Sequence, residues 1–163
     1  MLVHRSKVVL DEDYRNMLLK EYTTEYEGAE TLNEPRSVVD VMEKVFRLSE
    51  MAEEYMYLIC MTSKHRPISF FEVSHGTYNM TLAGMRELFI RTMLCGAASM
   101  ILVHNHPSGD PTPSLEDSKL TRRVQEAADL MGIIFCDHII IGHQNTYYSF
   151  QEHEGMSQNK LSI

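Results

Sequence analysis

Cysteine is scarce in this sequence, and no apolar run in it approaches the roughly 18 residues of a membrane span. Cys60, Cys95 and Cys136 are odd in number, lie in apolar surroundings and form no Cys-x-x-Cys pair. This pattern argues against a disulfide framework or a zinc knuckle and is typical of core residues in a reducing cytoplasm. Residues 1–7 also lack the apolar segment of a signal peptide. We therefore expect a cytoplasmic protein without a membrane partner.

Positive charge is in short supply as well, with 15 lysines and arginines against 23 aspartates and glutamates and a formal net charge of −8. A negative protein repels a phosphate backbone, so this balance disfavours nonspecific binding to nucleic acid. The closest basic cluster, Arg122 and Arg123 with Lys119, is flanked by acidic residues and is predicted to be a solvated helix face. DNA is therefore not an expected partner.

The 163 residues contain no internal repeat or low-complexity tract, and their length predicts one domain with a core of its own. Apolar residues spaced three and four apart predict helices, whereas alternating or continuous apolar runs predict strands. The predicted elements are, in chain order, an edge strand at 6–10, a helix in the first part of 11–30, an amphipathic helix at 37–52, an antiparallel strand pair at 55–61 and 68–74, a helix with a face from Leu82 to Met93, a strand at 97–103, a helix from Ser114 to Gly132, and closing strands at 133–142 and 146–150. The predicted fold is an α/β sandwich, in which helices flank a mixed, mostly antiparallel sheet. The last residues, 151–163, are expected to fray.

The stretch from His104 to Asp117 carries the strongest chemical signal. His104 and His106 follow the apolar run 100–103, and strand alternation points both side chains to the same side. Turn-forming residues then lead to Asp117 in the first turn of the next helix. Two imidazoles and a carboxylate leave one position of a tetrahedral Zn²⁺ open, which is how catalytic zinc is held.

A second interpretation of the same stretch is purely structural. Ser114 followed three residues later by Asp117 is a helix-capping pattern, and 37–40 repeats it where no chemistry is expected. A cap, however, does not need two histidines on the same side just upstream. The combination therefore favours a metal site.

These residues resemble a known family. His-x-His, seven residues, Ser, two residues and Asp is the metal motif of the JAB/MPN (JAMM) metalloproteases, and HNHPSGDPTPS followed by an acidic residue and Asp resembles their bacterial RadC branch. The similarity includes EEYMYLICM, GMRELF and CDHIIIG. It implies a JAB/MPN domain of cytidine-deaminase-like architecture at 37–150, an N-terminal extension with a short strand and a helix at 1–36, and a polar tail at 151–163. It also implies that His104, His106 and Asp117 bind zinc.

Amide hydrolysis additionally needs a carboxylate that takes a proton from water and passes it to the leaving amine. The upstream candidates are Glu50, Glu53, Glu54, Glu72 and Glu87. From the residues alone, Glu53 and Glu54 fit equally well. In JAB proteases the glutamate stands at the start of the first central strand, and the resemblance therefore favours Glu54, immediately before Tyr55.

The resemblance suggests roles for further residues. Ser114 matches the motif serine that donates a hydrogen bond to the bound water or the developing oxyanion. His138 lies in an apolar run that predicts burial and a supporting role, and Asp110 is a turn residue. The family usually shows Pro-Arg-Glu where this chain has Met-Arg-Glu at 85–87, which changes the entry to that helix.

The leading hypothesis is thus a zinc metallopeptidase that cleaves a peptide or isopeptide bond in a protein substrate. One alternative is a DNA-repair-associated protein, because the RadC family is named for DNA repair. Its full-length members usually carry a helix-hairpin-helix module, which this sequence does not show, and the negative charge also disfavours the alternative. A non-catalytic metal-binding interaction module is the other alternative, although here every motif position is filled. The sequence leaves the oligomeric state open, and a homo-oligomer is compatible with it.

Overall fold

A computed structural model describes residues 1–76 and 84–155. Within them, seven strands form one sheet in the order β2–β1–β4–β3–β5–β6–β7. The strands are β1 (Leu2–Leu10), β2 (Asn16–Glu25), β3 (Glu54–Met61), β4 (Pro67–Gly76), β5 (Ser99–Asn105), β6 (Ile134–Ile141) and β7 (Tyr147–Ser149). The pairs β1–β4 and β5–β6 are parallel and the others are antiparallel. The predicted mixed, mostly antiparallel sheet is confirmed.

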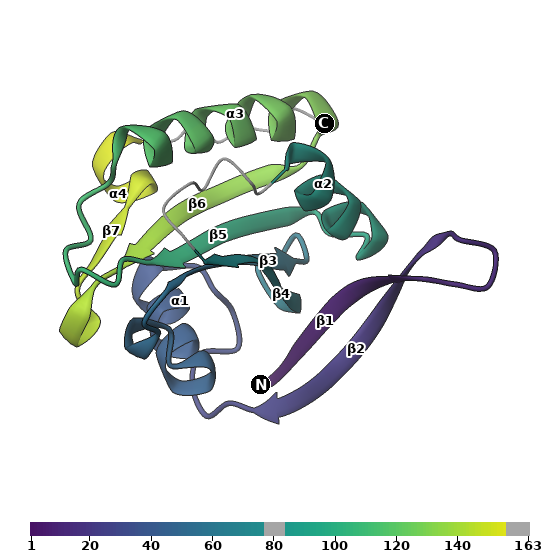
Figure 1. Cartoon of the computed structure of the whole chain (residues 1–163), viewed down its shortest axis with the longest axis horizontal. Coiled ribbons are helices and arrows are strands. Elements are labelled where there is room, and N and C mark those ends of the chain that lie inside the picture. The colour runs from purple at the N-terminus through teal and green to yellow at the C-terminus, as the bar shows by residue number, and fades with distance from the viewer. Residues whose placement is uncertain (77–83, 156–163) are drawn as a thin grey trace.

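Helices cover both faces of this sheet. They are α1 (Pro35–Val41), α2 (Met85–Leu94), α3 (Leu115–Met131) and α4 (Phe150–Glu154), with a π-helical turn at Met42–Phe46 and 3₁₀ turns at Leu48–Glu50 and His143–Asn145. Figure 1 shows α2 and α3 over one face and α1 against the other. Each face packs its own apolar cluster, so the fold is a three-layer α/β sandwich. In the part of the chain that the structure describes, no helix has the length and apolarity needed to span a membrane.

Strand β5 lies inside the sheet, between β3 and β6, and all of its residues are buried. The chain then crosses over through α3 and returns as β6, parallel to β5. Gly132 ends α3 as predicted, with a φ of 69° in the left-handed region that favours glycine. The crossover places the start of α3 above the end of β5, and this arrangement forms the site.

The N-terminal region differs from its prediction. Residues 16–25, expected to be partly helical, form β2, and β1 is longer than the predicted edge strand and lies inside the sheet. The Asp11 carboxylate accepts hydrogen bonds from the amides of Asp13 and Arg15, and Tyr14 adopts a φ of 61°, which closes a hairpin. The turn end of this hairpin extends away from the rest of the molecule in Figure 1, whereas β1 pairs with β4 at Arg5. Almost all of β2 is exposed, which explains why its apolar residues show no clear period.

Two other predictions need correction. The helix expected at 37–52 begins at Pro35 and becomes π-helical after Val41. The left-handed residue Arg47 ends the π-helical turn, and a separate 3₁₀ turn follows it. The expected frayed tail instead begins with α4, because the Ser149 hydroxyl caps that helix and the Asp137 carboxylate accepts a hydrogen bond from the Gln151 amide. Leu82 and residues 156–163 lie outside the described residues.

Candidate metal centre

Strand geometry brings three side chains of the site to one face of the sheet. His104 belongs to β5 and His106 lies just beyond its end, so alternation points both to the same side. In the antiparallel register, His104 is opposite Met56 of β3. Glu54 begins β3 two residues earlier and therefore shares that face. The face is the one covered by α2 and α3.

Asp117 reaches the same point from the first turn of α3, where Ser114 is the N-cap. The Ser114 hydroxyl oxygen accepts a hydrogen bond from the Asp117 amide at 3.1 Å. In return, the Asp117 Oδ2 atom accepts from the Ser114 amide at 2.7 Å and from its hydroxyl at 2.6 Å. This capping box holds the carboxylate so that Oδ1 faces His104 Nε2, 3.3 Å away.

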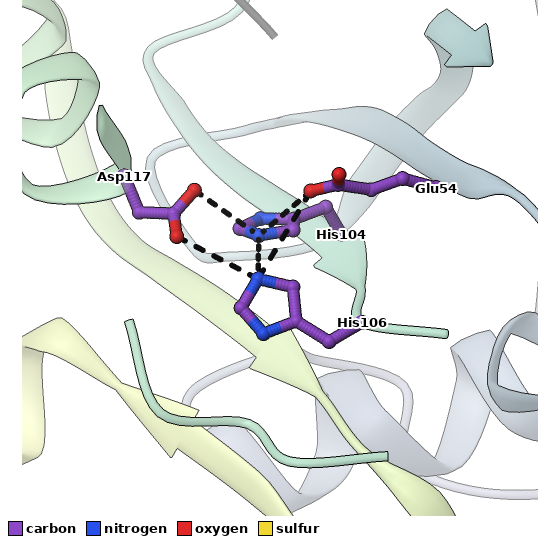
Figure 2. Close-up of side chains that lie close together, drawn as sticks. All are labelled: Glu54, His104, His106 and Asp117. Carbon is purple, nitrogen blue, oxygen red and sulfur yellow. Dashed lines mark hydrogen bonds and ion pairs between the residues drawn. The ribbon is translucent and has the colours of Figure 1, made fainter. Parts of the chain in front are cut away.

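Four side chains therefore converge, with Asp117 and Glu54 on opposite sides of the two imidazoles (Figure 2). The two Nε2 atoms of His104 and His106 lie 3.1 Å apart. His106 Nε2 is 3.6 Å from Asp117 Oδ2, and Glu54 Oε1 is 3.5 Å from His104 Nε2 and 4.0 Å from His106 Nε2. Tetrahedral coordination at about 2.0–2.2 Å puts neighbouring ligand atoms roughly 3.3–3.6 Å apart. The atoms of His104, His106 and Asp117, at 3.1, 3.3 and 3.6 Å from one another, are close to this spacing.

The hydrogen bonds around His106 show that this donor set fits a cation. Its Nδ1 atom lies 2.8 Å from the Asp110 carbonyl oxygen, which can only accept, so Nδ1 carries a proton. In the neutral ring, Nε2 then presents a lone pair toward His104 Nε2 and two carboxylates. Such a cluster is repulsive unless a positive charge stands among its atoms. Glu54, His104, His106 and Asp117 are thus a candidate metal site.

The electrostatics of the individual groups agree with this view. Burial alone would raise the pKa of Asp117, but its contacts with His104, His106 and Ser114 hold that pKa well below its usual range. Burial would lower the pKa of His106, but Asp117 and the Asp110 carbonyl outweigh it and raise the pKa. Burial raises the pKa of Glu54. The site therefore favours a positive charge at its centre.

The sequence comparisons identify the fold family. The family model described as "RadC-like JAB domain" matches residues 32–156. The chain belongs to the RadC-like JAB domain family. It is similar to UPF0758 proteins of Pelobacter propionicus, at 42% identity over 126 residues, and of Geotalea uraniireducens, at 40% over 125 residues. Each match covers 77% of this chain and 54% of the relative, so the chain spans about half the length of these curated relatives. Their names state no activity.

This RadC-like domain brings together all the metal ligands that its sequence predicts, with Glu54 beside them. Glu53 and Glu87 are exposed and lie outside the four-residue cluster. The carboxylate of Glu72 pairs with Arg5, and that of Glu50 pairs with Arg47. Ser114 caps α3 with its side chain and also lines the cavity described next.

The cluster opens into a cavity of about 780 Å³. The start of β3, the end of β4, the loop after β5 and the start of α3 bound it, through lining residues that include Glu53, Glu54, Gly76, His106, Ser114 and Asp117. This volume is within the range of sites that bury small ligands or short segments of chain. The candidate metal site is thus open to the cavity on one side and closed by the sheet on the other.

Sequence reasoning missed one residue that shapes the site. Asn105, between the two histidines, is fully buried. Its Oδ1 atom accepts a hydrogen bond from the Tyr55 amide at 2.8 Å, and its Nδ2 atom donates to the Glu53 carbonyl at 3.0 Å. The Asn105 side chain therefore fixes the backbone on both sides of Glu54. Its position between two predicted ligands is the sequence feature that could have pointed to it. Strand alternation, however, directs its side chain to the opposite face, and the sequence does not show which segment it contacts there.

Proposed function

We propose that this RadC-like domain is a zinc-dependent metallopeptidase of the JAMM type, which hydrolyses a peptide or isopeptide bond in a protein or peptide substrate. The observation that carries the proposal is the position of Glu54. Its carboxylate comes from β3, faces the two histidines opposite Asp117, and lines an open cavity. A purely structural metal site would have no use for an accessible carboxylate beside its ligands.

The donor set suits zinc. Two imidazole nitrogens and one carboxylate are the ligands of many catalytic zinc sites, which keep a fourth position for water. When bound, zinc supplies a nucleophile near neutral pH by lowering the pKa of a water molecule. His104, His106 and Asp117 would hold the ion, and Ser114 fixes the Asp117 carboxylate for this purpose.

Glu54 transfers the proton in this reaction. Its Oε1 atom takes a proton from the attacking water and delivers it to the nitrogen of the leaving amine, so the scissile C–N bond breaks without an amide anion as leaving group. Partial burial restricts its contact with bulk water, and the backbone bonds of Asn105 on either side hold it in place. Glu54 is thus both the acceptor and the donor of one proton within a single turnover.

Ser114 can contribute to the same reaction without releasing Asp117. Both its amide and its hydroxyl donate to Asp117 Oδ2, so the amide keeps the carboxylate in place when the hydroxyl turns toward a substrate oxygen. A hydroxyl that donates to a developing oxyanion contributes a few kcal/mol to the transition state. We assign this second role to Ser114.

The decisive experiment compares Glu54→Gln with Glu53→Gln, which removes the adjacent but exposed carboxylate. Cleavage is followed by mass spectrometry, which detects new N-termini in a proteome-derived peptide library and released lysine side chains in isopeptide-linked substrates. Glu54→Gln should keep its zinc and lose about 10²–10⁴-fold in rate, the usual contribution of a general base, whereas Glu53→Gln should retain activity. Full activity in zinc-loaded Glu54→Gln would remove Glu54 from the mechanism. A zinc-loaded wild type that cleaves nothing would favour a non-catalytic metal-binding module.

A further inference from the structure

Behind the candidate metal site, a buried row of hydrogen bonds joins β5, β6 and α3. His104 Nδ1 lies 2.9 Å from His138 Nε2, and His138 Nδ1 lies 2.6 Å from the Thr121 hydroxyl. The same hydroxyl lies 2.7 Å from the carbonyl oxygen of Asp117. His104 and His138 are fully buried and Thr121 is 6% exposed, so these groups must satisfy one another.

The direction of each bond follows from its neighbour. The Asp117 carbonyl can only accept, so the Thr121 hydroxyl donates to it and has only lone pairs left for His138. His138 Nδ1 must therefore carry a proton and donate it to Thr121. Since His138 is fully buried and both its nitrogens face uncharged partners, the ring is neutral and its Nε2 atom accepts. His104 must then donate from Nδ1, which leaves the lone pair of its Nε2 directed into the cluster.

We propose that Thr121 and His138 act as a pair of positioning residues that select the tautomer of His104, so that Nε2 is available to bind the metal. This inference rests on the metal site of the proposed function. A histidine that binds a metal often donates its other N–H to a carboxylate or a carbonyl oxygen, and these groups fix its tautomer by themselves because they can only accept. His138 is different, because a neutral imidazole nitrogen can either donate or accept. The Thr121 hydroxyl decides between the two, because it already donates to the Asp117 carbonyl and can only accept from His138.

Through this arrangement, α3 positions both the Asp117 carboxylate and the ring of His104. The helix presents the Asp117 carboxylate to the cluster, and the Asp117 carbonyl, through Thr121 and His138, sets the state of His104. The ring of His138 is itself held by stacking on Phe150, at 5.2 Å between centroids and 8° between planes. Correct docking of α3 on the sheet is therefore a condition for both ligands.

The test uses Thr121→Val, which keeps the shape and removes the hydroxyl, and Thr121→Ser, which restores it. Thr92→Val is the matched control, because Thr92 is also buried, donates to the carbonyl four residues earlier and lies in α2. Zinc affinity, measured by competition with a chelator, should fall about 10–100-fold in Thr121→Val and stay near the wild-type value in the other two variants. In the zinc-free proteins, long-range ¹H–¹⁵N spectra should show Nδ1–H His104 in the wild type and Thr121→Ser and a tautomer mixture in Thr121→Val.

The outcomes separate this inference from the proposed function. A wild type that binds no zinc refutes the proposed function, while the zinc-free spectra still test the tautomer. A wild type that binds zinc and a Thr121→Val variant with the same affinity and the same tautomer refute the inference alone. In a His138→Leu background the row is already broken, so Thr121→Val should add no further loss of zinc affinity. A further tenfold loss there would show that Thr121 acts by another route.

Discussion

Replacement of Asn105 by leucine tests how the position of Glu54 is fixed. The side chain is fully buried, and leucine has a similar volume but no polar atoms. The substitution removes the bond that the Tyr55 amide donates, the bond that the Glu53 carbonyl accepts, and a longer contact of 3.4 Å with the Met51 carbonyl. It leaves the histidines in place, because β5 remains paired through its backbone to β3 and β6.

The magnitude follows from the groups that lose a partner. A buried donor or acceptor without a partner costs about 1–3 kcal/mol. The Tyr55 amide is partly buried and should carry most of this cost, whereas Glu53 is exposed and its carbonyl can turn toward water. We therefore expect Asn105→Leu to lower the free energy of unfolding by about 1–3 kcal/mol.

The functional consequence should be selective. Released backbone on both sides of Glu54 lets its carboxylate move, so peptidase activity should fall while zinc stoichiometry stays at the wild-type value. Urea unfolding gives the stability, and hydrogen exchange at the Tyr55 amide reports the local release. Asn16→Leu, at the exposed start of β2, is the control for the change of residue type. Unchanged stability together with an equally protected Tyr55 amide would refute the role assigned to Asn105.

Three further predictions concern the metal, the charge and the pH dependence of stability. Elemental analysis should find zinc well below one per chain in His106→Ala, and wild-type stoichiometry in that variant would contradict the ligand assignment. Because of the net charge of −8, duplex DNA titrated at physiological salt should bind no more tightly than the nonspecific range of about 10⁻⁴–10⁻⁶ M, and nanomolar affinity would revive the DNA-repair alternative. Burial raises the pKa of Asp137 from 3.8 to about 6. Its contribution to stability is therefore present below pH 4 and lost as the pH rises through 6. Relative to Asp137→Asn, the wild type should lose up to about 3 kcal/mol in urea titrations over that range, and parallel pH profiles would show that Asp137 does not titrate there.

The parts of the site that the sequence predicts are those set by local geometry. Alternation along one strand puts His104 and His106 on the same side, and the capping pattern puts Asp117 in the first helical turn. Both relations hold within a few residues of chain, so they do not depend on knowing the partner strands. The helices and strands of the core around them also show clear periods of apolar residues, because each of them buries one face or both.

The N-terminal hairpin shows where such reasoning fails. Nearly all of β2 is exposed, so neither a helical nor a strand period is imposed on its side chains. Its structure comes instead from backbone pairing with β1 and from the turn at Asp11. Strand pairing of this kind is a relation between segments, and composition reports it only weakly.

The choice between Glu53 and Glu54 is also made by pairing. Both glutamates precede the same apolar run, and nothing in their own neighbourhood separates them. The register of β3 against β5 distinguishes the two glutamates. It sets Met56 opposite His104 and thereby places Glu54, two residues away, on the face of the histidines. A shift of one residue would have brought Glu53 to the cluster and turned Glu54 toward the opposite face. Asn105 reinforces the observed register with two hydrogen bonds on either side of Glu54, so the tripeptide that contains the two candidate histidine ligands also fixes which glutamate lies beside them.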